Sequence, residues 1–228
     1  MSHNDDGVNA AVRANASKRA RQLTTTLERI EIQWSRQDVP IARHLSPGLT
    51  NQQIDEIMAP TGIQLNEVHR ALFRWHDGAM SNDPDLSRDS RDTALFGMLQ
   101  FRSLAGMVEY WQGPWVQQGL DFARDITDEL GPHGPWGPNW FPLLYDAEER
   151  SPIVTRSTQA RWGDQETIWK SHLYESHDLV PRMVSLVALF QFLQVWLEHG
   201  YMRWDQDVMD WAYDDSIDKA TYRATWWW

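Results

Sequence analysis

The stretch that most restricts the fold is GPHGPWGPNWFPLLYD, residues 131–146, where three Gly-Pro-x triplets lead directly into an apolar segment. A collagen helix needs glycine at every third residue over a long run, and this pattern stops at Trp140. A flexible linker would not carry Trp136, Trp140 and Phe141. Gly and Pro instead favour a stiff turn with few hydrogen bonds, and the apolar run after it predicts a strand of a globular domain.

Several helices are predicted before this stretch. From Ser17 onward, apolar residues recur at steps of four, three and four and form one stripe of a helix; they are Leu23, Leu27, Ile30 and Trp34. Thr50 and Gln53 form a capping-box pattern. A short helix is therefore expected to begin at Thr50 and to end near Pro60, because proline does not continue a helix.

Two further capping residues mark the next helices. Asn66 is expected to cap a helix that Gly78 terminates, and the side chains facing the core are Val68, Leu72 and Trp75. Ser103 is expected to cap the segment SLAGMVEYW, and another helix is predicted over residues 115–130.

Strands are predicted in the middle of the chain, at residues 94–101, 140–145, 151–157 and 166–174. The closing helix, 183–199, is apolar on most sides, which indicates deep burial. Helices therefore come first, strands occupy the middle and a helix closes the domain. This order predicts an α+β fold with a mainly antiparallel sheet packed against several helices.

Composition divides the chain into three parts. We expect a flexible N-terminus over residues 1–16, a single domain over 17–200, and an acidic, aromatic C-terminal extension over 201–228. With 42% apolar residues and 14 tryptophans, the chain can bury a substantial core. The tryptophans of the extension either pack back over the domain or contact a partner, and we favour packing back.

Charge and cysteine content exclude several classes of function. The absence of cysteine excludes disulfides, thiolate metal sites and a cysteine nucleophile. The polar start MSHNDDGVNA does not resemble a signal peptide, and the most apolar segment, 184–197, is short of a membrane span, so we expect a cytoplasmic protein. The net charge of −11 argues against nucleic-acid binding and suits either simple solubility or a basic protein partner.

Catalytic signatures are scarce. The sequence holds no GxSxG elbow, no GxxxxGK[ST] phosphate loop, no GxGxxG and no HExxH. His69 and His76 lie seven residues apart, wider than a helical metal pair, and we interpret them as exposed polar residues beside the core stripe. Asp205-Gln206-Asp207 begins like a calcium loop, but Asp210 replaces the glycine required at the sixth position. We therefore expect no catalytic residue, no metal and no cofactor.

The segment PGLTNQQIDEIMAPTGIQLNEVHRALFRWHDG, residues 47–78, resembles the opening signature of the SUKH superfamily, which comprises Smi/Knr-like fungal cell-wall regulators and bacterial immunity proteins. Residues 136–146 are similar to the family's Trp-Pro strand, and 183–197 to its closing helix. Three departures are Asn66 in place of the usual proline, residues 147–150 in place of a Gly-Asp pair, and Val154-Thr155 in place of a Val-Asp pair. The matching residues are Trp34, Pro47, Gly48, Ile54, Leu65, Leu72, Trp75, His76, Asp77 and Gly78.

The resemblance implies a binding protein without catalytic residues. Among bacterial members it implies an immunity protein that binds and neutralises a cognate toxin, for example a nuclease. An acidic inhibitor would be steered toward the basic surface with which a nuclease binds its polymer. The alternative is a regulatory scaffold of the cell-wall-regulator type that binds several protein partners. A small hydrolase ranks third, because it would need an ordered triad or a metal.

We hypothesise that the partner contacts the acidic, partly aromatic segments that core packing does not explain. The competing interpretation is that these side chains are merely solvated. The residues in question are Asp83, Asp85, Asp89, Asp92, Glu148, Glu149, Asp205, Asp207, Trp211, Asp214 and Asp215.

Overall fold

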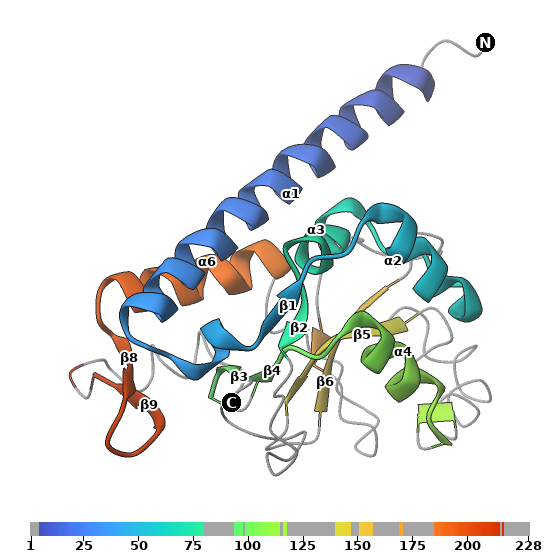
Figure 1. Ribbon diagram of the computed structural model, residues 1–228. Coiled ribbons are helices and arrows are strands. Elements are labelled where there is room, and N and C mark those ends of the chain that lie inside the picture. Colours follow the sequence, from blue (N-terminus) through green and yellow to red (C-terminus); the bar gives the residue numbers. More distant parts are fainter. Residues whose placement is uncertain are drawn as a thin grey trace.

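The computed structural model describes residues 5–79, 94–97, 99–114, 116–117, 140–146, 151–156, 169–170, 185–214 and 216. Within these residues the architecture is α+β, as predicted, and every strand pair is antiparallel. Figure 1 shows the long helix α1, Asp5–Arg36, and helix α6, Leu186–Glu198, side by side, with the central strands and the other helices on one side of them. No helix of the described part has both the length and the apolarity to cross a membrane.

Helix α1, Asp5–Arg36, carries the predicted apolar stripe on its second half. The stripe packs against α3, Glu67–Trp75, and α6, Leu186–Glu198. All four of its side chains are fully buried, namely Leu23, Leu27, Ile30 and Trp34. The helix begins at Asp5, although a flexible segment was predicted up to residue 16. Residues 10–20 are rich in alanine and arginine, and the strong helix propensity of both residue types extends α1 beyond the core that it covers.

The capping predictions for the next two helices are confirmed. Helix α2, Asn51–Met58, starts with a complete capping box: Thr50 Oγ1 accepts from the Gln53 N–H at 3.2 Å, and Gln53 Oε1 accepts from the Thr50 N–H at 2.8 Å. It ends in the 3-10 turn Ala59–Thr61. Asn66 Oδ1 accepts from the His69 N–H at 2.8 Å and so caps α3.

The end of α3 differs from the prediction. His76 is already extended, with φ −148° and ψ 151°, and begins strand β2, His76–Ala79, which pairs with β1, Leu45–Pro47. Gly78 has φ +79° and does not terminate the helix. A Cβ at Gly78 would lie 2.4 Å from the backbone nitrogen of Ser103, so glycine permits a close approach of β2 to the residues that precede helix α4, Leu104–Gln112.

The central sheet has the strand order β3-β4-β5-β6-β7. The segment 94–101 was predicted as one strand, but the chain reverses near Gly97, which has a left-handed φ of +51° and so divides it in two. Strand β5 is buried from Trp140 to Leu144, as the apolar run predicts. The strands are Ala94–Phe96 (β3), Leu99–Gln100 (β4), Trp140–Asp146 (β5), Ser151–Arg156 (β6) and Trp169–Lys170 (β7).

Helix α4, Leu104–Gln112, lies against the sheet. Ser103 Oγ accepts from the Gly106 N–H at 3.1 Å, so the predicted cap is confirmed. Trp111 Nε1 donates to the carbonyl oxygen of Trp140 at 2.8 Å and ties the helix to β5. Most of the helix predicted over 115–130, and the Gly-Pro triplets before Trp140, lie outside the described residues.

The C-terminal segment folds back onto the domain. After α6 come strands β8, Met202–Asp205, and β9, Asp210–Tyr213, which pair as a hairpin. A 3-10 turn, Pro40–Arg43, lies earlier in the chain, after α1. Met202, Trp204 and Trp211 belong to the same buried cluster as α1 and α6. Packing back is therefore confirmed for the extension up to Tyr213, because its tryptophans share the core of the domain.

Candidate partner-binding surface

Hairpin β8–β9 contains a buried tryptophan pair, one register position away from the pair Asp205–Asp210 that closes its turn. Trp204 and Trp211 lie directly opposite each other in the strand register, with ring centroids 5.4 Å apart in a T-shaped arrangement. Each is only 6% exposed. Aromatic cross-strand pairs stabilise a two-stranded hairpin, which would otherwise be marginal in water. The pair therefore fixes the hairpin to the core.

The hairpin is also held by the end of α1. Gln37 Oε1 accepts from the Trp204 N–H at 2.9 Å. Gln206 Nε2 donates to the carbonyl oxygens of Gln37, at 3.0 Å, and of Asp38, at 3.3 Å. Carbonyls at a helix C-terminus lack partners within the helix, and Gln206 supplies a donor for them. These bonds hold the turn of the hairpin at a defined place beside α1.

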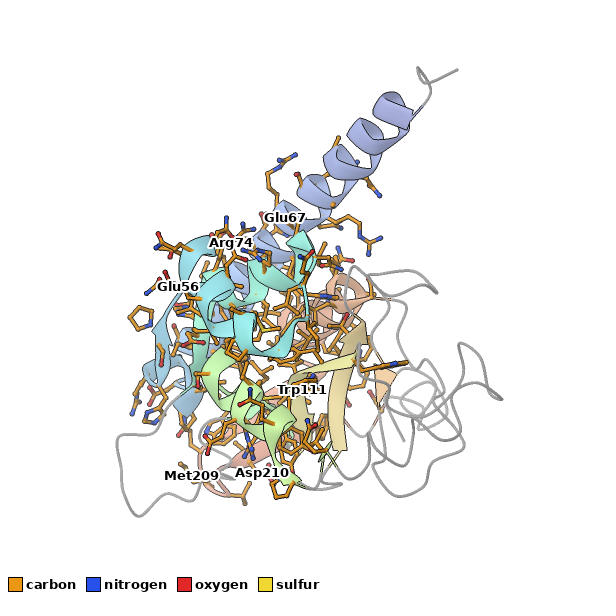
Figure 2. The ribbon with its side chains drawn as sticks, turned by 90° about the vertical axis from the view of Figure 1, so that its right-hand side faces the viewer. Glu56, Glu67, Arg74, Trp111, Met209 and Asp210 are labelled. Carbon is orange, nitrogen blue, oxygen red and sulfur yellow. The ribbon has the colours of Figure 1, made fainter. Side chains whose placement is uncertain are left out.

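The tip of the hairpin exposes two apolar side chains. Val208 is 66% exposed and Met209 is 47% exposed, at the turn that joins β8 to β9. Met209 has φ +52°, a left-handed conformation that is uncommon outside glycine. Figure 2 shows Met209 and Asp210 together at the edge of the molecule.

Carboxylates flank these apolar side chains. Asp205 Oδ1 accepts from the Asp207 N–H at 3.0 Å, and Asp210 Oδ1 accepts from the Trp211 N–H at 2.8 Å. Asp205 and Asp207 form no ion pair with the described residues. The cation on this hairpin is Arg203. We call the set Asp205, Asp207, Val208, Met209 and Asp210 the hairpin tip.

The structure places the predicted site residues in three different situations. Asp205 and Asp207 lie together at the hairpin tip. Asp214 is exposed just after β9, where hydrogen bonds from Ser216 lower the pKa of its carboxyl group. Trp211 is in the core, so a role in partner contact does not fit its 6% exposure. The remaining predicted residues lie outside the described part of the chain; they are Asp83, Asp85, Asp89, Asp92, Glu148, Glu149 and Asp215.

The sequence reasoning missed the apolar part of this surface. Val208 and Met209 interrupt an acidic segment, DQDVMDWAYDD, and the prediction rested on its aspartates and on Trp211. The sequence did contain a signal, which is the pair of consecutive apolar residues between aspartates. Alternate residues of a strand point to opposite faces, so two consecutive apolar side chains cannot both face the core of a regular strand.

His69 is not exposed, contrary to the prediction. It is completely buried on α3, and Thr155 Oγ1 of β6 lies 3.1 Å from its Nδ1. Burial lowers the pKa of His69 to about 3, so the ring is neutral at physiological pH. The prediction considered only the spacing of residues on the helix. It was wrong because Thr155 of β6 packs against the side of α3 that carries His69.

His76 also has an internal role. Its Nδ1 donates to the carbonyl oxygen of Ser46 at 2.7 Å, and its Nε2 lies 3.4 Å from Glu31 Oε2. The same carboxylate oxygen accepts from Trp75 Nε1 at 3.1 Å. His76 and its neighbour therefore connect α1, α3 and β1.

Asp77 joins β2 to α4. Its Oδ1 accepts from the Leu104 N–H at 2.7 Å, which satisfies one of the unpaired donors at the start of that helix. Burial raises the pKa of the Asp77 carboxyl group. His76, Asp77 and Gly78, the three residues that close the SUKH-like segment, thus all serve contacts between elements.

No group of three or more His, Asp or Glu among the described residues is placed to hold a metal ion. One open hollow formed by described residues lies along α1 and is lined by Glu28, Glu31, Ile32, Ser35 and Arg36, and another lies between α2 and α4.

Comparison with known proteins adds no relative. No family model matches the chain, and no curated protein matches it. The resemblance to the SUKH superfamily therefore stays a prediction.

Proposed function

We propose that this chain is a non-catalytic binding protein and that its partner contacts the hairpin tip. One observation carries the proposal: a turn fixed to the core exposes Val208 and Met209 between the carboxylates of Asp205, Asp207 and Asp210. Apolar anchors surrounded by a polar rim are typical of the energetic centre of a protein interface.

The fixed geometry of the tip favours binding. Ordering a flexible loop on association reduces affinity, because each immobilised side chain loses conformational entropy. The Trp204–Trp211 pair and the Gln206 bonds already hold this turn in the unbound protein. Association would therefore order little more than the exposed side chains.

The chemistry of the tip specifies the kind of partner. A complementary surface would have an apolar hollow for Val208 and Met209 and basic side chains around it. The net charge of −11 would accelerate encounter with such a surface, most strongly at low salt.

Within this class, the function best supported is that of a cytoplasmic immunity protein which neutralises a cognate bacterial toxin. The support comes from the SUKH-like segment and from charge, since a nuclease toxin exposes a basic surface to its polymer. The alternative is a regulatory scaffold that binds several partners weakly. The number of partners separates the two, because immunity requires one tight partner.

The test measures binding to the protein encoded by the adjacent reading frame. Association and dissociation rates would be compared for the wild type, Val208→Ser/Met209→Ser and Asp205→Asn/Asp207→Asn. The apolar double variant is expected to accelerate dissociation by roughly tenfold or more, as loss of an interface anchor does. The amide double variant is expected to slow association at low salt and to reduce its salt dependence.

Ile32→Ser provides the matched control. Ile32 is 50% exposed on α1, so this variant removes an exposed apolar side chain away from the hairpin. Its kinetics should equal those of the wild type. If both hairpin double variants also bind the neighbouring protein as the wild type does, the hairpin tip is not the interface.

A further inference from the structure

A second apolar surface lies between α2 and α4. These helices are neighbours on the side of the molecule away from hairpin β8–β9 (Figure 1). The groove between them has a volume of about 650 Å³ and is open to solvent. Its apolar lining includes Ile57 of α2, Ala105 and Val108 of α4, and Pro60 of the 3-10 turn that follows α2.

Two carboxylates line this groove from opposite sides. Glu56 belongs to α2 and Glu109 to α4, and both side chains are exposed. Glu56 Oε1 accepts from Gln52 Nε2 at 2.8 Å, a bond within α2 that leaves the charge in place. Neither glutamate forms an ion pair with the described residues, and none of the described residues that line the groove is Lys or Arg.

The neighbouring acidic residues of the same helical layer are neutralised. Asp55, adjacent to Glu56 on α2, pairs with Arg70 at 2.8 Å. Glu67 pairs with Arg74 at 2.6 Å, and both arginines come from α3. Figure 2 shows Glu67 and Arg74 close together, with Glu56 on the neighbouring helix. Arg70 and Arg74 therefore form ion pairs on the side of α2 that faces α3, and the carboxylates on the α2–α4 groove are not neutralised by them.

We propose that the α2–α4 groove binds a peptide segment of a protein partner that carries an apolar side chain flanked by Lys or Arg. The apolar side chain would occupy the space between Ile57 and Val108. The cations would lie toward Glu56 and Glu109, which is the charge complementarity that the groove presents. Its volume is in the range of specific binding sites, and its open form suits a segment of chain.

This inference is independent of the hairpin tip. The two surfaces share no residue and belong to different elements. A partner could use either alone, and the test therefore needs no prior identification of a toxin.

The test uses three labelled synthetic peptides as probes. The first alternates leucines and lysines at helical spacing, the second has glutamate in place of lysine, and the third has serine in place of leucine. Fluorescence anisotropy at low salt is expected to show binding of the first peptide only. Amide chemical shifts of the protein should change around Ile57, Ala105 and Val108.

Two variants locate the interaction. Glu56→Gln/Glu109→Gln is expected to weaken binding of the first peptide by roughly tenfold at low salt, because two exposed ion pairs are lost. Ala105→Gln adds bulk at an exposed position in the groove and should weaken binding without changing charge. Asp205→Asn/Asp207→Asn removes the same charge at the hairpin tip and should leave peptide binding unchanged.

Three results would overturn the inference. The serine peptide could bind as tightly as the leucine peptide, which would indicate attraction by charge alone. The two groove variants could bind as the wild type does. The hairpin variant could lose as much affinity as the glutamate variant, which would assign binding to overall charge.

Discussion

The acidic residues near α3 and those of the hairpin tip differ in what they face. Around α3, Glu31 accepts from Trp75, and Asp77 accepts from the Leu104 N–H. At the tip, Asp205 and Asp207 accept only a local backbone bond or none, and they surround exposed apolar side chains. Acidic residues with long-range internal partners hold the fold together. In the function proposed above, Asp205 and Asp207 contact another molecule, because they lie on a fixed turn and have no long-range partner among the described residues.

The largest expected effect separates the buried tryptophan pair of the hairpin from the exposed apolar side chains of its tip. Trp211→Ala should lower the free energy of unfolding by about 3–5 kcal/mol, the usual cost of deleting a buried aromatic side chain. Val208→Ala and Met209→Ala should each change it by less than about 0.5 kcal/mol, because both side chains are exposed. Urea denaturation measures all three.

A control variant refines the comparison. The indole N–H of Trp211 is buried and has no hydrogen-bond partner among the described residues, so Trp211→Phe removes an unsatisfied donor while keeping most of the ring. Its stability should lie within about 1 kcal/mol of the wild type. Equal stability of Trp211→Ala and the wild type would show that the hairpin is not part of the core.

The next effect tests the close approach of β2 to the start of α4. Gly78→Ala should lower the free energy of unfolding by about 3 kcal/mol, because the new Cβ meets backbone atoms and the left-handed φ is strained. Gly62→Ala is the control, since Gly62 also has a left-handed φ of +67° but nothing lies within 4 Å of an added Cβ. It should cost about 1–2 kcal/mol. If the two variants lose equal free energy of unfolding, the strain of the left-handed φ explains both losses and the contact with Ser103 adds nothing.

The third effect is a pH dependence caused by His69. Its pKa is about 3 in the folded protein and 6.5 in the unfolded chain, so only the unfolded chain gains this proton between these values. Stability is therefore complete above pH 6.5 and falls as the pH is lowered. The loss from His69 should be about 2 kcal/mol between pH 7 and pH 5.

His69→Gln isolates this contribution. Glutamine can still hydrogen-bond to Thr155 but does not titrate in this range, so the variant should lose about 2 kcal/mol less than the wild type does over the same pH interval. Denaturation curves at several pH values measure the difference. If the free energy of unfolding depends on pH in the same way for both proteins, the pH dependence comes from groups other than His69.

Local signals in the sequence predicted most helix starts correctly. Thr50, Asn66 and Ser103 each bond to an N–H group three residues ahead, so the partner lies in the same short segment. The stripe on α1 and the apolar run of β5 were likewise predictable, because burial of a periodic face follows from residue spacing. Fold class followed from the order of these elements.

Contacts between distant segments were not predictable in this way. Thr155 lies 86 residues from His69 in sequence, and only the packed sheet shows that it covers the ring. Gly78 fits the pattern of a helix terminator, but its role depends on Ser103. The exposure of Val208 and Met209 was unpredictable for the same reason. Whether an apolar pair in an acidic segment is buried or exposed depends on how the neighbouring tryptophans pack against the domain.

The smallest effect tests the opening comparison directly. Glu31→Ala should lower the free energy of unfolding by about 1 kcal/mol, because the partly buried Trp75 N–H and the His76 ring lose an acceptor. Asp207→Ala, an equal change of charge at the hairpin tip, should cost less than about 0.5 kcal/mol, because the Asp207 carboxylate bonds to no described residue. Thermal denaturation at two salt concentrations measures both. If Asp207→Ala proves as costly as Glu31→Ala, the tip acids stabilise the fold, and the reason to regard them as reserved for a partner disappears.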